Sequence, residues 1–321
     1  MARPRDANVD AGTSASHAAI AGAIAGGATR LIAAPLDLIK IRFQVQQAPI
    51  SGRAPDAKYV SFVQSLRSIH AEEGLRSFWR GNLSATALWV SYSGIQFGCY
   101  RELNLLVPPD VAANHKTLVS SVNGAIAGVV ATTVTYPLDL FRTVFASQGM
   151  PRRFQSLRAL TEHTLQTQGV HGLYSGLSPT LFQIAPYMGL SFGIYSSLNA
   201  MTASHMDLDT GGLGWALSFV GTGAVAGLVS KLAVYPLDTI KKRMQMRQVQ
   251  RHVSYGVIPH YTTSWQCFVD ILRREGVVGL YKGTYPSLLK SVVTHSSTFA
   301  TYEVALLAIE HLSDHGSVWA D

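Results

Sequence analysis

Three copies of a short charged motif contain the residues with the clearest chemistry. Each copy has a proline, an aspartate two positions later and a lysine or arginine three positions after that, and the copies begin at Pro35, Pro137 and Pro236. An acid and a base three residues apart lie on one face of a helix. Charges inside an apolar segment are costly and normally pair with one another. The motif therefore predicts ion pairs in the interior of a helical assembly.

Three equivalent copies allow each aspartate to reach the base of a neighbouring copy. We expect ion pairs Asp37–Arg142, Asp139–Lys241 and Asp238–Lys40. Such a ring would close one end of a central cavity, and the alternative is independent, solvated charges at helix ends. Each proline removes a backbone hydrogen bond and is expected to kink its helix.

The helices that carry these residues recur in a fixed register. A Gly-xxx-Gly pair precedes each proline by the same distance, and small residues four apart let another helix approach closely; the pairs are Gly22/Gly26, Gly124/Gly128 and Gly223/Gly227. A second sequence motif follows each proline, and its three copies end at Gly81, Gly176 and Gly283. Each repeat is therefore predicted to hold two membrane helices, joined by polar segments with short amphipathic helices near 59–72, 153–167 and 261–274.

The charge pattern favours a membrane protein over a soluble helical bundle. Only 14% of the 321 residues are charged, against about 25% in soluble domains, and most of the long uncharged stretches reach the roughly 20 residues of a bilayer span. We predict an all-α membrane protein with six transmembrane helices, in three tandem two-helix repeats around a pseudo-threefold axis. The repeats are placed at 15–110, 111–206 and 207–313, between a flexible N-terminus (1–14) and a C-terminal tail (314–321). The N-terminal sequence resembles neither a secretory signal nor an Arg-rich transit peptide, so internal targeting is expected.

The complete pattern resembles the mitochondrial carrier family. That family's signature is Pro-x-Asp/Glu-x-x-Lys/Arg-x-Lys/Arg, followed by Asp/Glu-Gly-xxxx-aromatic-Lys/Arg-Gly. Residues 35–42 with 73–81, and 236–243 with 275–283, meet it in full, whereas the middle repeat has Val144, Gln168 and Ser175 at the charged positions. The resemblance covers residues 15–312 and implies an inner-membrane carrier that alternates between cytosol-open and matrix-open states.

The resemblance also assigns two gates. The six paired residues correspond to the family's matrix gate, and Gln44 and Gln245 stand where glutamines brace its ion pairs; Ala146 occupies this position in the middle repeat. At the opposite gate only Glu303 keeps the family's charge, so a weak cytosolic gate is expected.

The expected cavity lining indicates an anionic substrate. Arg30 lies seven residues, or two turns, before Asp37, on the same face, and Lys231 is its counterpart in the third repeat. The family's contact positions add Leu88, Gln183, Ile184 and Lys290, and one turn further Tyr92 and Tyr187. Three cations with no acid beside them attract phosphate or carboxylate groups, although Arg30 or Lys231 could instead pair structurally. Tyr92, Tyr187 and Trp89 are candidates for stacking on a flat ring, although single aromatics more often pack or face lipid.

Within the family, residues 35–44, 78–82 and 92–97 are most similar to members that exchange thiamine pyrophosphate for matrix nucleotides. Carriers of adenine nucleotides or coenzyme A are the alternative. The resemblance also implies a monomer in contact with inner-membrane lipid, cardiolipin in particular. No cofactor, metal site or nucleic-acid surface is predicted, and the sequence lacks the phosphate-binding loop, Gly-x-Ser-x-Gly and His-Glu-x-x-His motifs of common enzyme classes. A proton leak or a membrane scaffold on the same fold is the remaining alternative.

Overall fold

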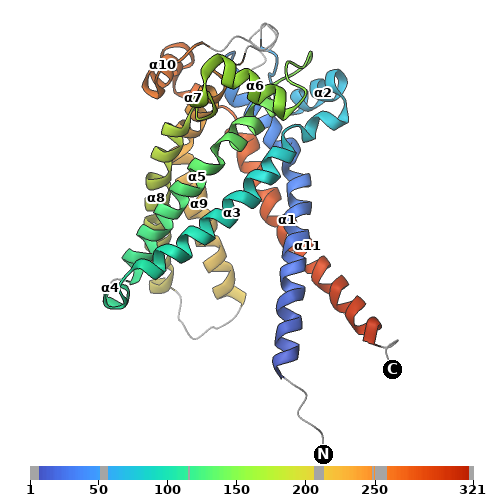
Figure 1. The fold of residues 1–321 in the computed structure, drawn as a ribbon, viewed down its shortest axis with the longest axis vertical. Coiled ribbons are helices and arrows are strands. Elements are labelled where there is room, and N and C mark those ends of the chain that lie inside the picture. Colours follow the sequence, from blue (N-terminus) through green and yellow to red (C-terminus); the bar gives the residue numbers. More distant parts are fainter. Residues whose placement is uncertain are drawn as a thin grey trace, which may run out of the picture. The chain divides into compact units, whose positions relative to one another are not determined.

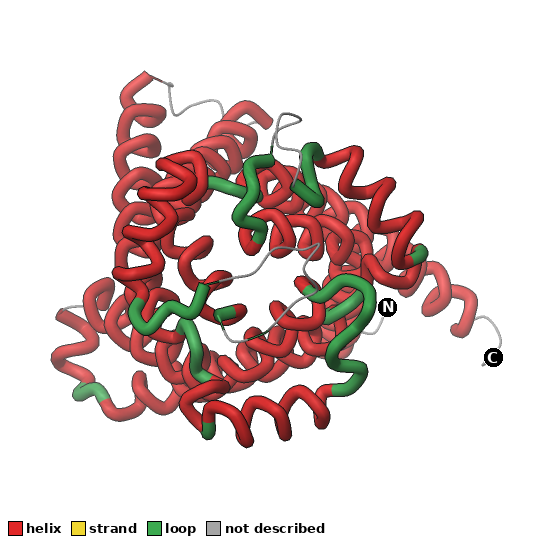
Figure 2. Tube along the Cα trace, turned by 90° about the horizontal axis from the view of Figure 1, so that it is seen from above, coloured by secondary structure: helices red, strands yellow, loops and turns green. Residues whose placement is uncertain are grey.

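The computed structural model describes residues 7–50, 57–114, 116–205, 213–247, 249 and 259–317. Regular structure in these residues is helical throughout (Figure 2), which confirms the all-α prediction. The long helices in this part of the chain coincide with the six predicted spans: α1 (Ala7–Val45), α3 (Asn82–Leu106), α5 (Lys116–Ser147), α8 (Leu177–His205), α9 (Leu213–Met246) and α11 (Thr284–Ser317).

Within the described residues, two of these helices contain segments long and apolar enough to cross a membrane on length and composition alone. They are Ile20–Val45 in α1 and Leu118–Ser147 in α5. Large apolar side chains are nevertheless exposed along the other helices, for example Phe97 (73%) on α3 and Phe182 (70%) on α8. Exposed apolar area on this scale is expected where lipid rather than water surrounds a helix.

The helices run through the motif prolines. Pro35, Pro137 and Pro236 lie inside α1, α5 and α9, so the ion-pair residues stand on continuous helix. Helix α1 begins at Ala7 and thus includes 7–14 of the segment expected to be flexible, while 1–6 lie outside the described residues. Helix α11 reaches Ser317, inside the predicted tail, and 318–321 lie outside the described residues.

Short helices link the long ones where the sequence places amphipathic segments. They are α2 (Phe62–Glu73) with the 3-10 helix η1 (Leu75–Trp79), α6 (Leu157–Gln168) with α7 (Val170–Leu173), and α10 (Ser264–Leu280). Each first turn is capped by a side-chain oxygen that accepts a backbone N–H bond, from Ser61, Ser156 and Thr263. Helix α10 is interrupted at Gly276 (φ 69°), the counterpart of the breaks at Gly74 and Gly169. The short helix α4 (Pro109–Asn114) precedes α5.

The chain divides into two units, which we describe separately. The larger, 38–285, holds the end of α1 and all elements from α2 to α10. In it α3 packs along α5 and α8 along α9 (Figure 1), and the core includes Ile39, Phe43, Ile69 and Leu160. The smaller unit, 1–37 with 286–321, pairs the first part of α1 with α11, where the Thr29 and Thr298 hydroxyl oxygens lie 3.1 Å apart.

Candidate functional site

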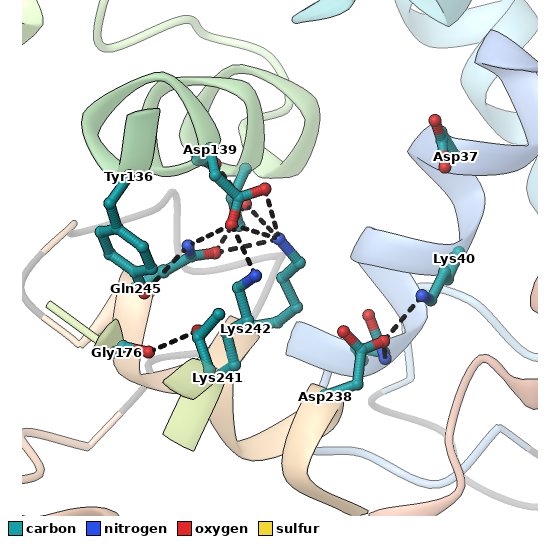
Figure 3. A network of polar contacts seen from close by, with 12 residues as sticks. Asp37, Lys40, Tyr136, Asp139, Gly176, Asp238, Lys241, Lys242 and Gln245 are labelled. Atoms are coloured by element: carbon teal, nitrogen blue, oxygen red, sulfur yellow. Dashed lines mark hydrogen bonds and ion pairs between the residues drawn. The ribbon is translucent and has the colours of Figure 1, made fainter. Parts of the chain in front are cut away.

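The first ion pair of the ring joins Lys40 to Asp238. The Lys40 Nζ lies 2.7 Å from Asp238 Oδ2 (Figure 3). The Gln44 amide donates to the same oxygen at 3.0 Å. The ammonium also lies 5.6 Å from the centre of the Tyr235 ring. The carboxylate and the aromatic face compensate the ammonium of Lys40, whose side chain is 17% exposed, and the Gln44 amide supplies a second donor to the carboxylate.

The second ion pair has the same construction. The Lys241 Nζ lies 2.9 Å from Asp139 Oδ2, and the Gln245 amide donates to that oxygen at 2.8 Å (Figure 3). Lys241 is 5.8 Å from the centre of the Tyr136 ring. The Tyr136 hydroxyl accepts from the Gln245 amide at 3.2 Å and donates to the Ser175 carbonyl at 2.8 Å. The structure therefore brings together four of the six ring residues and both glutamines.

A third lysine, which the sequence analysis missed, belongs to the second pair. The buried Lys242 Nζ donates to Thr143 Oγ1 at 2.8 Å and to Gln245 Oε1 at 3.1 Å, and it lies 3.3 Å from Asp139 Oδ1. Asp139 therefore faces two ammonium groups (Figure 3). The signal in the sequence is the lysine doublet of the third copy, because the equivalent position in the first copy is Ile41.

Asp37, the remaining acid of the ring, pairs with a residue expected to bind substrate. In the smaller unit its Oδ1 lies 2.5 Å from the Nζ of Lys290 on α11. The predicted pair of Asp37 with Arg142 would join the two units and stays a prediction.

The glycine that ends the second motif of each repeat lies close to the backbone of a neighbouring helix. Gly81, Gly176 and Gly283 have φ of 79°, 87° and 83°, a conformation that favours glycine. A Cβ there would stand 2.8–3.0 Å from a backbone carbonyl oxygen, that of Arg142, Lys241 and Lys40 respectively. These are the basic residues of the repeated motif, so each repeat packs its closing glycine against the backbone of the motif base on a neighbouring helix.

A second group of charges lies beside these glycines in the first and third repeats. Glu73 holds Arg42 and Arg80, and Glu275 holds Arg243 and Lys282, in closely equivalent triads. Both arginines are about 1% exposed and bind their carboxylate through two nitrogens. Burial lowers the pKa of Lys282, which its hydrogen bond to Glu275 opposes.

The buried arginines also reach across to the neighbouring repeat. Arg42 donates to the carbonyls of Ala146 and Gln148 at 3.0 Å, at the end of α5. Arg243 donates in the same way to Gln44 and Gln46 at the end of α1, at 3.0 and 3.3 Å. Because the last carbonyls of a helix have no partner within the helix, each arginine satisfies a helix end.

These paired elements recur at regular intervals along nearly the whole chain, and a sequence comparison accounts for them. The model of the family described as mitochondrial carrier protein matches residues 12–110, 113–205 and 215–311. The chain belongs to this family. It is therefore a multi-pass carrier of the mitochondrial inner membrane, and the family points away from enzyme activity.

Curated relatives cover most of the chain. A mitochondrial thiamine diphosphate carrier from Arabidopsis thaliana is 40% identical over 308 residues, which cover 89% of this chain and 92% of that protein. A second such carrier, from Zea mays, is 39% identical over 88% of this chain and 91% of its own. The mitochondrial thiamine pyrophosphate carrier of Homo sapiens is 36% identical over 89% of both chains.

The middle repeat of this carrier departs from the triads, as its sequence indicates. Val144, Gln168 and Ser175 replace the two bases and the acid, so no counterpart of Arg42 reaches from this repeat to the end of α9. Instead Arg247, at the end of α9, donates to the carbonyl of Tyr261 at 3.0 Å and contacts the Ser175 hydroxyl at 3.4 Å.

The residues predicted to bind substrate share one property. All eight are half-buried, namely Arg30, Leu88, Tyr92, Gln183, Ile184, Tyr187, Lys231 and Lys290. Trp89, by contrast, is 61% exposed. Arg30 and Lys290 lie in the smaller unit and the other six in the larger. Among the described residues no group of three or more His, Cys, Asp or Glu side chains is arranged to hold a metal ion.

Proposed function

We propose that this carrier imports thiamine pyrophosphate into the mitochondrial matrix in exchange for nucleotides, by alternating access. The observation that carries the proposal is the similarity, at 36–40% identity over most of each chain, to proteins curated as carriers of this compound. The named substrate is a dianionic or more highly charged diphosphate with a flat heterocycle, which matches the cationic and aromatic residues predicted to line the cavity.

The paired lysines and aspartates support a gate on the matrix side. Lys40–Asp238 and Lys241–Asp139 each join two repeats and each has a glutamine donor. Moving those helices apart separates the charges, so the pairs hold one conformation until other interactions replace them. We assign Asp37, Lys40, Asp139, Arg142, Asp238 and Lys241 to this gate, with Gln44 and Gln245 as braces and Pro35, Pro137 and Pro236 as kink positions.

The substrate site is proposed at the half-buried cations. Arg30, Lys231 and Lys290 supply the positive charge for a diphosphate, which arginine can bind through two nitrogens. Tyr92 and Tyr187 supply faces for a heterocycle. Half-burial suits this role, because a charged side chain that reaches a water-filled cavity avoids the cost of full desolvation.

Three further assignments complete the proposal. Matrix nucleotides are the counter-substrate, cardiolipin is the lipid in contact with the carrier, and the transport unit is a monomer. Adenine nucleotides or coenzyme A as the imported substrate are the alternative. Like thiamine pyrophosphate, both carry phosphate groups and a flat ring that can stack on an aromatic side chain.

Uptake by reconstituted liposomes tests the substrate. Vesicles that contain the purified carrier and internal ATP receive labelled thiamine pyrophosphate, ADP or coenzyme A outside. We expect saturable uptake of thiamine pyrophosphate that requires internal nucleotide and is lost in Asp238→Asn, which breaks a gate pair. Uptake of ADP or coenzyme A but not of thiamine pyrophosphate would contradict the proposed substrate and leave the family assignment unchanged.

A further inference from the structure

Arg247 occupies a position that holds a glutamine in the other two repeats. Gln46 and Gln148 stand eleven residues after the motif prolines of the first two repeats, and Arg247 stands eleven residues after the third. The Gln46 side chain donates to the carbonyl of Tyr59 at 2.8 Å and accepts from its N–H at 3.0 Å. Gln148 binds the backbone of Phe154 in the same way, at 2.9 and 3.1 Å. Each glutamine thus clamps the segment that leads from a long helix to the next short one.

Arg247 keeps one half of this clamp and adds a contact to the middle repeat. Its Nη1 donates to the carbonyls of Tyr261 and Thr262, at 3.0 and 3.4 Å, but a guanidinium offers no acceptor to a backbone N–H. Its Nη2 donates to the hydroxyl of Ser175, at 3.4 Å. One arginine therefore joins the loop of the third repeat to the second motif of the middle repeat.

This contact runs in the opposite direction from the one between the third and first repeats. There Lys282 donates to the carbonyls of residues 46–48, at 2.6–3.1 Å. Ser175 is the counterpart of Lys282 in the middle repeat. Its carbonyl accepts from the Tyr136 hydroxyl, as that of Lys282 accepts from the Tyr235 hydroxyl. A serine placed in this way is too short to replace the lysine, so at this junction the base comes from the neighbouring repeat.

The contact through Arg247 is weaker than those of the buried arginines in the two triads. It is one hydrogen bond of 3.4 Å between two side chains, whereas Arg42 and Arg243 each donate to two backbone carbonyls of a neighbouring repeat. Within the described residues, the buried Nε of Arg247 has no hydrogen-bond partner. Because opening of the junction gives this N–H access to water, its hydration offsets part of the lost contact.

We propose that Arg247 is a reversible latch that holds the end of α9 to the middle repeat through Ser175. It takes the place of the glutamine clamp in its own repeat and of the base that the middle repeat lacks. The latch opens more readily than the contacts of Arg42 and Arg243, since it rests on one hydrogen bond. The inference goes beyond the proposed function, because it concerns the junction between two repeats and depends on no particular substrate.

Ser147 can report on this junction. It is the last residue of α5 and is fully buried, and its hydroxyl donates to the sulfur of Met246, the last residue of α9, at 3.0 Å. A Ser147→Cys thiol is therefore shielded while the two helix ends touch, and it reacts with a maleimide when they part. Cys99→Ser removes the half-buried native thiol, and the fully buried Cys267 remains as an internal reporter of global unfolding.

The latch is then removed from either side. Arg247→Gln introduces the glutamine of the other repeats, which can clamp Tyr261 but is too short to reach Ser175, and Ser175→Ala removes only the acceptor. We expect each variant to raise the labelling rate of the Ser147→Cys thiol about 3- to 10-fold while Cys267 stays unlabelled, because one hydrogen bond from a charged donor is lost. The two substitutions together should raise the rate no further than one alone.

Gln46→Ala is the matched control. It removes the glutamine clamp of the first repeat, where the side chain bonds to Tyr59 and Ala48 and not to α5 or α9. It should therefore leave the labelling rate of the Ser147→Cys thiol unchanged. Unchanged labelling in both latch variants, additive effects in the double variant, or equally faster labelling in Gln46→Ala would each overturn the inference.

A thermal-unfolding cycle with the native cysteines tests the same contact if the Ser147→Cys protein does not fold. Ser175→Ala should lower the midpoint of unfolding in the wild type and leave it unchanged in Arg247→Gln, where the donor to Ser175 is already gone. An equal fall in both backgrounds would show that Ser175 contributes independently of Arg247, and the latch would be rejected.

Discussion

Replacing Lys242 by methionine tests whether the extra lysine strengthens the contact between α5 and α9. Methionine has nearly the same length, so packing is preserved and the ammonium alone is lost. The structure gives that group good hydrogen bonds to Thr143 at 2.8 Å and to Gln245 at 3.1 Å, and a longer contact of 3.3 Å to Asp139. Asp139 keeps Lys241 at 2.9 Å and the Gln245 amide at 2.8 Å, so it is not left uncompensated.

The loss is therefore about two hydrogen bonds from a charged donor, each worth about 1.5–3 kcal/mol. Part of this loss in stability is offset in the methionine variant, because it no longer buries an ammonium group, which costs several kcal/mol. We expect a net loss of about 1–3 kcal/mol in the free energy of unfolding, or a fall of about 1.5–4.5 °C in the midpoint of thermal unfolding in detergent. Lys241→Met should cost more, about 3–5 kcal/mol, because it removes the closer partner of a buried carboxylate.

A double-mutant cycle with Thr143→Val isolates the shorter hydrogen bond and should give a coupling free energy of about 1–2 kcal/mol. Unchanged or higher stability in Lys242→Met would show that desolvation outweighs the hydrogen bonds. A loss as large as that of Lys241→Met would show that Asp139 depends on both lysines equally. Either result refutes the reasoning.

Three further outcomes are expected. Gly283→Ala should lower the unfolding midpoint more than Gly74→Ala, because both have positive φ but only at Gly283 would a Cβ meet a carbonyl oxygen, at 2.9 Å; equal shifts in thermal unfolding would contradict this. Glu275→Gln leaves two buried bases without their acid and should cost about 3–5 kcal/mol in the same measurement, whereas a neutral result would indicate that backbone carbonyls suffice. Cys267 is fully buried and burial raises its pKa to about 12, so its thiol should react with a maleimide at pH 7 only after unfolding, and rapid labelling of folded protein would contradict its placement.

The threefold repetition explains why two of the ion pairs could be predicted from the sequence. Once three equivalent helices are assumed, the position of Asp139 and Asp238 relative to their lysines follows from register alone. The same register predicts the closing glycines, whereas the two glutamines were predicted from the family resemblance. A feature that occurs in all three copies can be predicted, because each copy constrains the interpretation of the other two.

The features missed are those that occur in one or two copies. Lys242 has Ile41 as its counterpart in the first copy, so repetition gives no signal for it. The tyrosines under Lys40 and Lys241 precede the proline in two repeats, where the first has Ala34. Lys290 was predicted from the family's contact positions, and its ion pair with Asp37 has no charged counterpart, because the equivalent positions in the other two repeats are Leu88 and Gln183.

The middle repeat lacks the glutamate-centred charge triad of the other two, so the three contacts between neighbouring repeats are not equivalent. Arg42 and Arg243 anchor the ends of α5 and α1 to the preceding repeat at the outer edge. The middle repeat has Val144 at the equivalent position, so at this junction Arg247 contacts the Ser175 hydroxyl at 3.4 Å, and Lys241 and Lys242 both reach Asp139. We therefore expect the ends of α5 and α9 to separate at a lower free-energy cost than the helix ends held by Arg42 and Arg243. Val144 in place of an arginine thus predicts that the three junctions open one after another and not all at once.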